Sequence, residues 1–433
     1  MNHSKRILST LGIAMLAIVA MAQSGTNSPY SQYGLGILSD QSQGFNRGMN
    51  GLAYGLHQSN QVNFLNPASY ANVDSLTFLF DIGISLQNTN FKENGASRNA
   101  KNSNFEYAVG AFRLAKGMGF SFGVIPFTNI GYSFSDSSYV SKNSSTYNVR
   151  KYSGTGGLHQ AYIGMGVSPF KNFSLGANIS YLWGDYTKAF SSSYNDSYVN
   201  SLYKIYSADV KSYKLDLGLQ YLLQLDKKTS LTLGAVYGFG HKLGADPECE
   251  VISTNSSTGV SDTTKFSINN GLSIPSSFGA GFAIKRAEKW TVGMDYSLQK
   301  WGNEKLPDFT ITNDVPKYAL SDNMLMDRHK FTIGGEIIPD AYNRSLFGRI
   351  HYRAGMSYAT PYIKINGVDG PKEMSASLGF GIPIQNGYNN RSILNISGQW
   401  VHSSAKEFIT ENKFRINIGI TFNERWFMKW KVE

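Results

Sequence analysis

Cysteine is almost absent from this chain of 433 residues, which has Cys249 alone. A single thiol cannot form an internal disulfide, and this excludes a small secreted domain held together by disulfides. Cys249 lies in a polar stretch, where we expect an ordinary surface residue. Charged residues are also scarce, at 16%, and the formal net charge of +10 is spread along the chain without a basic stripe. That spread argues against nucleic acid as a partner.

Long apolar runs are confined to the N-terminus. After residue 22 no run reaches the roughly 18 residues that a membrane-spanning helix needs. At the N-terminus, Lys5 and Arg6 precede an apolar run over residues 7–21, and small residues stand before Gln23. This pattern predicts a secretory signal peptide over residues 1–22. An anchor helix is the alternative, but the run is short for a bilayer, and no lipid-anchoring cysteine follows it.

Recognisable catalytic motifs are missing as well. The seven histidines are scattered, and the chain has no H-E-x-x-H, no paired cysteines and no G-x-S-x-G. We therefore expect a protein that is not an enzyme and has no cofactor and no metal. A barrel lipase or protease stays open, because catalytic triads are spatial rather than sequential. His57 is interpreted as a hydrogen-bonded polar residue rather than a metal ligand.

The chain is rich instead in strand-forming aromatics and in glycine, with 26 Tyr, 26 Phe and 44 Gly. Residues 76–86 show how apolar and polar side chains are arranged in such a segment. The even positions are apolar throughout, and most of the odd positions are polar or glycine. The even positions are Leu76, Phe78, Phe80, Ile82, Ile84 and Leu86. A period of two over this length predicts a β-strand with one apolar face and one wet face.

The same alternation recurs along the chain, and it predicts about fourteen strands. The expected strands cover residues 76–91, 105–114, 120–135, 160–167, 173–189, 208–223, 231–240, 274–284, 290–301, 329–338, 349–358, 373–382, 392–402 and 414–422. Short and long connections alternate between them, as the periplasmic turns and outer loops of bacterial outer-membrane barrels do. We therefore expect an all-β transmembrane antiparallel barrel with both termini in the periplasm. A soluble β-sandwich is the alternative architecture.

The stretch before the first strand has no period. Residues 44–73 are broken by Gly, Asn and Pro, yet contain several apolar side chains. Irregular backbone cannot face lipid, because each unpaired polar group would cost several kcal/mol. Residues 23–73 are therefore expected to form a plug inside the lumen, followed by a barrel over residues 74–422 and a periplasmic tail over residues 423–433.

These features resemble the FadL-type outer-membrane transporters of long-chain fatty acids and other hydrophobic compounds. Gly48 and the stretch from Gly51 to Gly55 lead into Asn66-Pro67-Ala68. This arrangement is similar to the family's glycine-rich hatch, which ends in an NPA motif. Residues 274–278, 290–301, 329–336 and 353–355 match later parts of the family pattern. The resemblance implies a fourteen-stranded barrel with an N-terminal hatch. The hatch and ligand residues would be Gly48, Tyr54, Leu56, Phe64, Leu65, Asn66, Pro67 and Ala68.

Pro126 falls inside the third expected strand. Proline has no N–H and is otherwise confined to strand edges and bulges, so the ladder must open or bulge there. The resemblance implies an inward kink that makes a side window from the lumen to the bilayer. Pro126, Gly123 and Asn129 would frame this lateral opening, and the Asn66-Pro67-Ala68 end of the plug would lie against it.

The loops depart from the family pattern. Residues 191–201 and 251–262 are polar and rich in Ser, Thr and Asn, without the apolar helical stripe of an outer capture groove. The sequence predicts passive uptake of a hydrophobic small molecule across a Gram-negative outer membrane, with lateral release into outer-membrane lipid. The alternative is a non-transporting FadL-like barrel that acts as an assembly or secretion partner of another outer-membrane or periplasmic protein.

Overall fold

Each long alternating segment of the sequence forms a β-strand that pairs with its neighbours in the sheet. The computed structural model describes residues 25–141, 145–313, 315–384 and 392–425. The strands of the wall are β2 (Thr77–Glu93), β3 (Ala96–Ala115), β4 (Met118–Pro126) with β5 (Thr128–Tyr139), β6 (Tyr147–Phe170), β7 (Phe173–Tyr194), β8 (Ser201–Gln224), β9 (Thr229–Gly238), β14 (Ser277–Arg286), β15 (Trp290–Gln299), β18 (Arg328–Ile337), β19 (His351–Ala359), β22 (Lys372–Ile384), β23 (Ser392–Ser404) and β24 (Thr410–Arg425).

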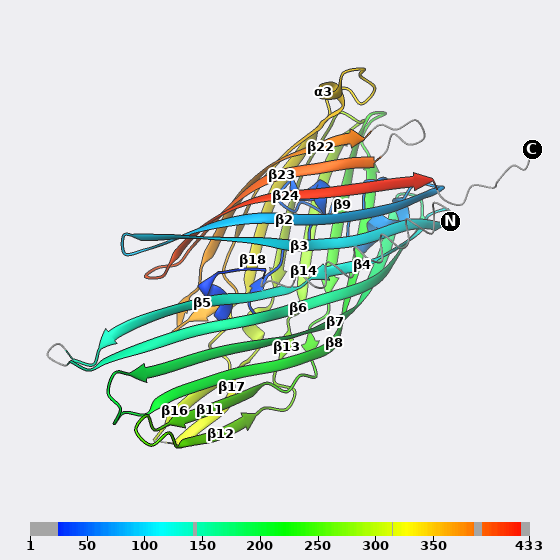
Figure 1. Ribbon diagram of the computed structural model, residues 1–433. Helices are drawn as coiled ribbons and strands as arrows, with labels where there is room; N and C mark the ends of the chain where they lie inside the picture. Colours follow the sequence, from blue (N-terminus) through cyan, green and yellow to red (C-terminus); the bar gives the residue numbers. More distant parts are fainter. Residues whose placement is uncertain (1–24, 142–144, 314, 385–391, 426–433) are drawn as a thin grey trace, which may run out of the picture.

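The wall closes where the first strand meets the last. β2 pairs antiparallel with β24, from Thr77 opposite Arg425 to Lys92 opposite Thr410. With β4 and β5 counted as one, the closed wall has fourteen strands, as the sequence predicts. Most connections at one end of the barrel, the turn end, are short, and most at the other, the loop end, are longer (Figure 1). The exceptions are residues 338–350 at the turn end and residues 94–95 at the loop end.

The two faces of the wall are reversed relative to a soluble protein. On β2 the apolar side chains point outward, and Leu86 is 51% exposed. The polar side chains of the same strand point into the lumen, where Asp81 is fully buried. A soluble sandwich would bury the apolar face instead, so this arrangement excludes it. An outward apolar band over a polar interior is the pattern of a membrane-spanning barrel.

The loop end is built largely of β-structure. β6, β7 and β8 have 24, 22 and 24 residues, whereas about 9–11 residues are enough for a strand to cross a bilayer. The other elements there are β11 (Glu248–Thr254), β12 (Ser261–Ser267), β10 (His241–Lys242), β13 (Ser273–Ile274), β16 (Leu306–Thr312), β17 (Val315–Ser321), β20 (Lys364–Ile365), β21 (Val368–Asp369) and the 3-10 helix η3 (Trp301–Asn303). Figure 1 shows β6–β8, β11, β12, β16 and β17 projecting together at the lower left.

Cys249 corrects one expectation drawn from the sequence. It is not a surface residue of a loop, because β11 lies between β8 and β12 and continues the sheet of the wall. Cys249 stands opposite Tyr206 on one side and Phe266 on the other, and its side chain is buried.

The N-terminal segment, residues 25–76, lies inside the wall, where Figure 1 shows its dark blue elements. Its elements are the 3-10 helix η1 (Pro29–Gln32), the strand β1 (Ile37–Leu38), the short helix α2 (Gly44–Arg47) and the 3-10 helix η2 (Pro67–Asn72). A further short helix, α3 (Leu346–Arg349), lies between β18 and β19. The expected signal peptide lies outside the described residues, as does most of the expected tail, since β24 runs on to Arg425. Within the described residues no helix has the length and apolarity required to cross a membrane.

Candidate functional site

The wall is interrupted at the third strand, where the sequence predicts one continuous strand over residues 120–135. Two strands, β4 and β5, stand there instead, and they meet at Pro126 and Phe127. β6 pairs with both of them, from Val167 opposite Met118 to Tyr147 opposite Tyr139. The N–H of Phe127 donates to the carbonyl of Leu158 at 2.7 Å, which keeps the chain on β6 across the break.

On the other side of the break the wall opens. β3 pairs with β4 only as far as Ala108, which stands opposite Val124. Among the described residues, β5 has no pairing with β3, and the outer half of β3 pairs with β2 alone. Gly123 stands opposite Val109, one residue before this pairing ends. A Cβ at Gly123 would be 2.5 Å from the carbonyl oxygen of Ala108. The opening between β3 and β5 therefore begins next to Pro126.

The N-terminal segment occupies this opening. Ile37 of β1 pairs with Asn129 of β5, and the Asn129 side chain donates to the Ser39 hydroxyl at 2.8 Å. Further along β5, the Ser31 hydroxyl accepts from the Gly131 N–H at 3.1 Å and donates to its carbonyl at 3.2 Å. The segment thus supplies partners to the β5 edge that β3 leaves free.

The space left at the opening is small and polar. A cavity of about 40 Å³ lies there. Its lining includes Asp40, Asn104, Glu106, Lys413 and Arg415. Charged and amide groups disfavour the passage of an apolar molecule through it.

Nearer the turn end, the wall holds the backbone of the N-terminal segment with polar side chains. The carboxylate of Asp295 accepts from the N–H groups of Ala53 and Tyr54, at 2.6 and 2.9 Å. The amide of Gln220 donates to the carbonyls of Tyr54 and Leu56, each at 3.0 Å. The Ser377 hydroxyl donates to the carbonyl of Gly48 at 2.9 Å. These bonds satisfy backbone groups that would otherwise be buried without partners.

The Asn66-Pro67-Ala68 motif does not lie where the sequence analysis places it. Asn66 caps η2 by accepting from the Ala68 N–H at 3.1 Å, and its side chain donates to the carbonyls of Tyr54 and Leu219. Pro67 faces lumen glycines of β6, β7 and β8 rather than Pro126. These wall glycines are Gly166, Gly176 and Gly218. The wall can approach the motif this closely because these positions carry no side chain.

Phe64 and Leu65 directly precede this motif and pack against the wall. Phe64 is buried against Tyr162 of β6, with ring centroids 4.6 Å apart, and Leu65 packs on the same cluster. The carbonyl of Phe64 accepts from the Asn178 side chain at 3.2 Å. Two of the expected ligand residues are therefore buried in packing contacts. Phe64 packs against the wall, and Leu56 packs mainly within the N-terminal segment.

The loop-end half of the lumen is filled by a larger apolar cluster. The N-terminal segment contributes Tyr30 and Leu35, and the wall and its outer elements contribute the rest. Members of the cluster include Ile130, Leu158, Leu182, Val210, Leu243, Ile274, Trp301, Tyr362 and Ile363, and all of them are buried. Close packing of this kind leaves no room for a ligand among these side chains.

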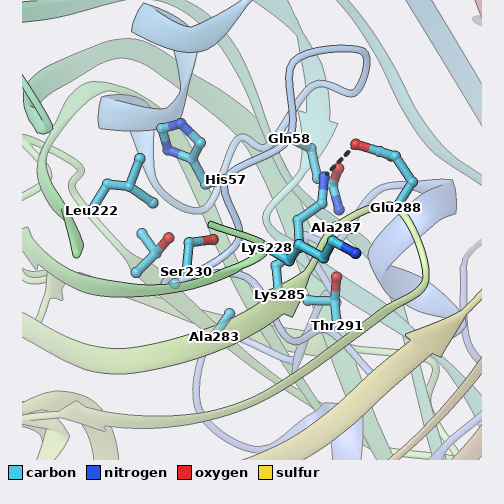
Figure 2. A pocket seen from close by; sticks show the side chains of 12 residues that line it. His57, Gln58, Leu222, Lys228, Ser230, Ala283, Lys285, Ala287, Glu288 and Thr291 are labelled. Carbon is cyan, nitrogen blue, oxygen red and sulfur yellow. Dashed lines mark ion pairs between the residues drawn. The ribbon is translucent and has the colours of Figure 1, made fainter. Parts of the chain in front are cut away.

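A cavity of about 230 Å³ lies at the turn end, below the N-terminal segment (Figure 2). Its lining includes His57, Lys228, Lys285 and Glu288, and Lys285 and Glu288 form an ion pair at 3.3 Å. The Nδ1 of His57 is hydrogen-bonded to the Asn72 amide at 2.8 Å. Within the part of the chain that the structure describes, no group of three His, Cys, Asp or Glu side chains could hold a metal ion.

Sequence reasoning did not identify these anchors, and two of them show why. Asp295 had a usable signal, since it stands on the polar face of an alternating strand and needs a partner in the lumen. Ser31 had none. Its bond to Gly131 joins positions that are far apart in sequence and depends on the break at Pro126.

Comparison with known proteins places the chain among relatives. A family model described as BamG matches residues 4–433. Among solved structures, the CymD monoaromatic hydrocarbon channel is 14% identical, with a TM-score of 0.60, over 92% of this chain and 99% of that one. The Ralstonia pickettii toluene transporter TbuX is 14% identical, with a TM-score of 0.60, over 89% and 98%.

A Pseudomonas aeruginosa FadL homologue is 11% identical, with a TM-score of 0.60, over 88% of this chain and 98% of that one. The comparison with curated proteins gives no match. At these identities the solved structures show a shared fold, and the resemblance to FadL-type barrels is confirmed at that level.

Proposed function

Because this chain belongs to the BamG family and the loop-end half of its FadL-type barrel is filled, we propose that it acts in the outer membrane as a partner of other proteins in assembly or secretion. In this proposal the barrel is not an open channel. The turn end faces the periplasm and the loop end faces the cell exterior, as the alternation of short and long connections suggests.

The filled lumen is the observation that carries this proposal. A passive channel needs a continuous path, whereas Leu182 and Val210 of the wall and Leu35 of the N-terminal segment belong to one buried cluster. At about 25 cal/mol per Å² of buried apolar surface, opening such a cluster costs far more than thermal energy. The polar lining of the opening beside Pro126 supports the same conclusion.

The projecting sheet at the loop end supports a role in binding another protein. A strand such as β6, with 24 residues, is about 80 Å long, and the hydrocarbon core of a bilayer is about 30 Å thick. The part of β8 that extends beyond the membrane pairs with β11, and β11 in turn pairs with β12. A paired sheet of this kind offers a partner a fixed surface, which lowers the entropy lost on binding.

The test shortens that sheet without changing its register. Glu250 stands opposite Lys265, so Asn-Gly in place of residues 250–265 leaves Cys249 and Phe266 paired across a two-residue turn. We expect a protein that copurifies stoichiometrically with the full chain to be lost from this variant. The control replaces residues 91–98 by Asn-Gly, which leaves Asn90 opposite Asn99 at the tip of the β2–β3 hairpin. Copurification that survives the first change, or fails equally with the control, would count against the proposal.

Uptake of hydrophobic small molecules with lateral release is the second candidate. One observation favours it: β3 and β5 part beside Pro126, and a gap there would lead from lumen to bilayer. Uptake of toluene by protein in liposomes would test it. A variant with Pro126→Val and an engineered disulfide that joins β3 to β5 across the gap should then take up none. Uptake by this closed variant at the wild-type rate would rule out the lateral route.

A further inference from the structure

β12 is the last strand of the sheet that projects at the loop end. It pairs with β11, from Ser261 opposite Thr254 to Ser267 opposite Glu248, and among the described residues no strand pairs with its other edge. β11 in turn pairs with residues 201–207 of β8. These residues form the outer end of β8, beyond the about 9–11 residues that suffice to cross a bilayer. The free edge of β12 therefore lies in water outside the bilayer.

Two hydrogen bonds that frame the β11–β12 ladder show which backbone groups face this edge. The Asn255 N–H donates to the Val260 carbonyl at 2.8 Å, and the Ile268 N–H donates to the Pro247 carbonyl at 3.1 Å. Hydrogen-bonded and non-hydrogen-bonded pairs alternate in an antiparallel ladder, so the even-numbered residues of β12 bond to β11. The odd-numbered residues point their N–H and C=O groups to the free edge. These residues are Ser261, Thr263, Lys265 and Ser267.

The edge of β12 lacks the features with which proteins usually block a free strand. The pairing of β11 with β12 has no register shift, and β12 contains no proline. Lys265 is the one charged residue among those whose backbone faces the edge. Its ammonium group lies 3.5 Å from the Glu250 carboxylate of β11, which holds the charge over the sheet rather than beyond it.

Two strands of the wall, β3 and β5, also leave an edge free toward the loop end. The outer part of β3 carries Arg98 and Lys101, and charged side chains, lysine above all, discourage strand pairing. β5 already receives partners from the N-terminal segment at Asn129 and Gly131. β12 is therefore the edge best suited to accept a further strand.

One face of the sheet at β12 is covered by the hairpin of β16 and β17. The ring centroid of Phe266 lies 5.7 Å from that of Phe309 of β16, and Tyr206 of β8 lies 6.3 Å from Tyr318 of β17. Tyr206, Cys249 and Phe266 stand opposite one another on adjacent strands, so Phe266 ends a row of side chains at the edge. This packing fixes the edge strand before a partner arrives, which lowers the entropy lost on binding.

We propose that the partner of this protein adds an extended segment to the free edge of β12, as a further strand of the projecting sheet. The inference rests on the proposed function, since it states how the partner binds. The backbone of the segment would exchange hydrogen bonds with Thr263 and Lys265. An apolar or aromatic side chain of the segment would lie opposite Phe266, where the pair is not hydrogen-bonded and the side chains approach closely. The residues next to it would be polar, because Thr263 and Lys265 lie on an exposed face.

The test places proline at a position whose N–H faces the free edge. Thr263→Pro removes one donor and puts the ring where the added strand would lie, without removing a bond to β11. The protein that copurifies with the full chain should then be recovered at a level about tenfold or more lower, because a hydrogen bond of the new ladder is lost and the ring obstructs the strand. Thr263→Ala keeps the N–H and should retain the partner at the wild-type level.

Ser135→Pro is the matched control on β5. The Val140 N–H donates to the Thr146 carbonyl at 3.0 Å, so by the same alternation the Ser135 N–H points away from β6. This variant should keep the partner at the wild-type level. Heat-dependent gel migration shows whether each variant has folded.

Amide hydrogen exchange gives a direct readout of the added strand. Exchange over residues 261–267 should be slower in the purified complex than in the chain stripped of its partner, because the free N–H groups become hydrogen-bonded. Exchange over residues 132–139 of β5 should be the same in both samples. Unchanged exchange over residues 261–267 would contradict the added strand.

The outcomes separate this inference from the proposed function. If the partner is lost on replacing residues 250–265 but kept by Thr263→Pro, the added strand is wrong and the partner role stands. If both variants keep the partner, or if the full chain purifies without a stoichiometric protein, both proposals are wrong. Equal loss from Ser135→Pro, or native mass spectrometry that finds a dimer of this chain as the complex, would overturn the partner strand on β12.

Discussion

Arg47 of the N-terminal segment and Glu106 of β3 form a buried ion pair, with 2.9 Å between Nη1 and Oε2. The same guanidinium group donates to the Asn417 side chain of β24 at 3.1 Å and to the carbonyl of Asp40 at 2.9 Å. One side chain of the segment therefore joins two wall strands and its own preceding turn. This places a strong anchor of the segment beside the opening between β3 and β5.

Glu106→Gln should destabilise the protein by about 3–5 kcal/mol, because it removes the carboxylate that pairs with the buried charge of Arg47. Replacing both residues by apolar ones, Arg47→Met with Glu106→Leu, should cost less. The free energy of unfolding by urea in detergent, followed by tryptophan fluorescence, measures both. Asp136→Asn breaks the exposed pair with Arg150 and serves as the control, with an expected change of about 0–1 kcal/mol. An equal loss for both pairs would contradict the anchor role.

Deleting residues 25–63 should raise single-channel conductance in planar bilayers, because it also removes Tyr30 and Leu35 from the apolar cluster that fills the loop-end half of the lumen. The deletion removes the backbone held by Asp295 and Gln220 together with the apolar side chains of Met49, Leu52 and Leu56. Water would then fill the turn-end half of the lumen. Unchanged conductance would mean that this segment does not limit passage through the barrel.

Much of the wall could be predicted from the sequence, because a strand that crosses a membrane has apolar residues at the positions that face lipid and polar residues at the alternate positions that face the lumen. On β2 the apolar set of Phe80, Ile82 and Ile84 points outward, and the polar positions are buried. The break at Pro126 was also marked in the sequence, since a missing N–H is a local property. The sequence did not show that β5, rather than β4, would lose its pairing with β3.

The loop end and the interior could not be predicted in the same way. β11 and β12 have no apolar face, so the residues around Cys249 read as a loop even though they extend the sheet. The position of Pro67 depends on lumen glycines such as Gly176 and Gly218. A lone glycine in a strand signals a close approach but does not say to which residue.

Cys249 should react slowly with thiol reagents in the folded protein. Burial raises the pKa of its thiol from 9.0 to about 11, and the thiolate is the reactive form. At pH 8 only about one thiol in a thousand would be ionised, and the buried side chain is also shielded from the reagent. Iodoacetamide labelling followed by mass spectrometry measures this, with urea-unfolded protein as the control. Labelling of the folded chain as fast as the unfolded one would contradict the buried position of β11.

Gly166→Ala tests whether η2 is seated against the wall. A Cβ at Gly166 would lie 2.7 Å from both the carbonyl oxygen of Pro67 and the backbone nitrogen of Ala71, which is closer than real contacts allow. Either η2 or β6 has to move, and overpacking of this kind costs about 1–3 kcal/mol. Gly398→Ala is the matched control, because Gly398 faces outward from β23 and a Cβ there meets nothing within 4 Å. The urea midpoint should fall for the first variant and stay near wild type for the second. Equal midpoints would mean that the N-terminal segment does not pack against β6 as the structure has it.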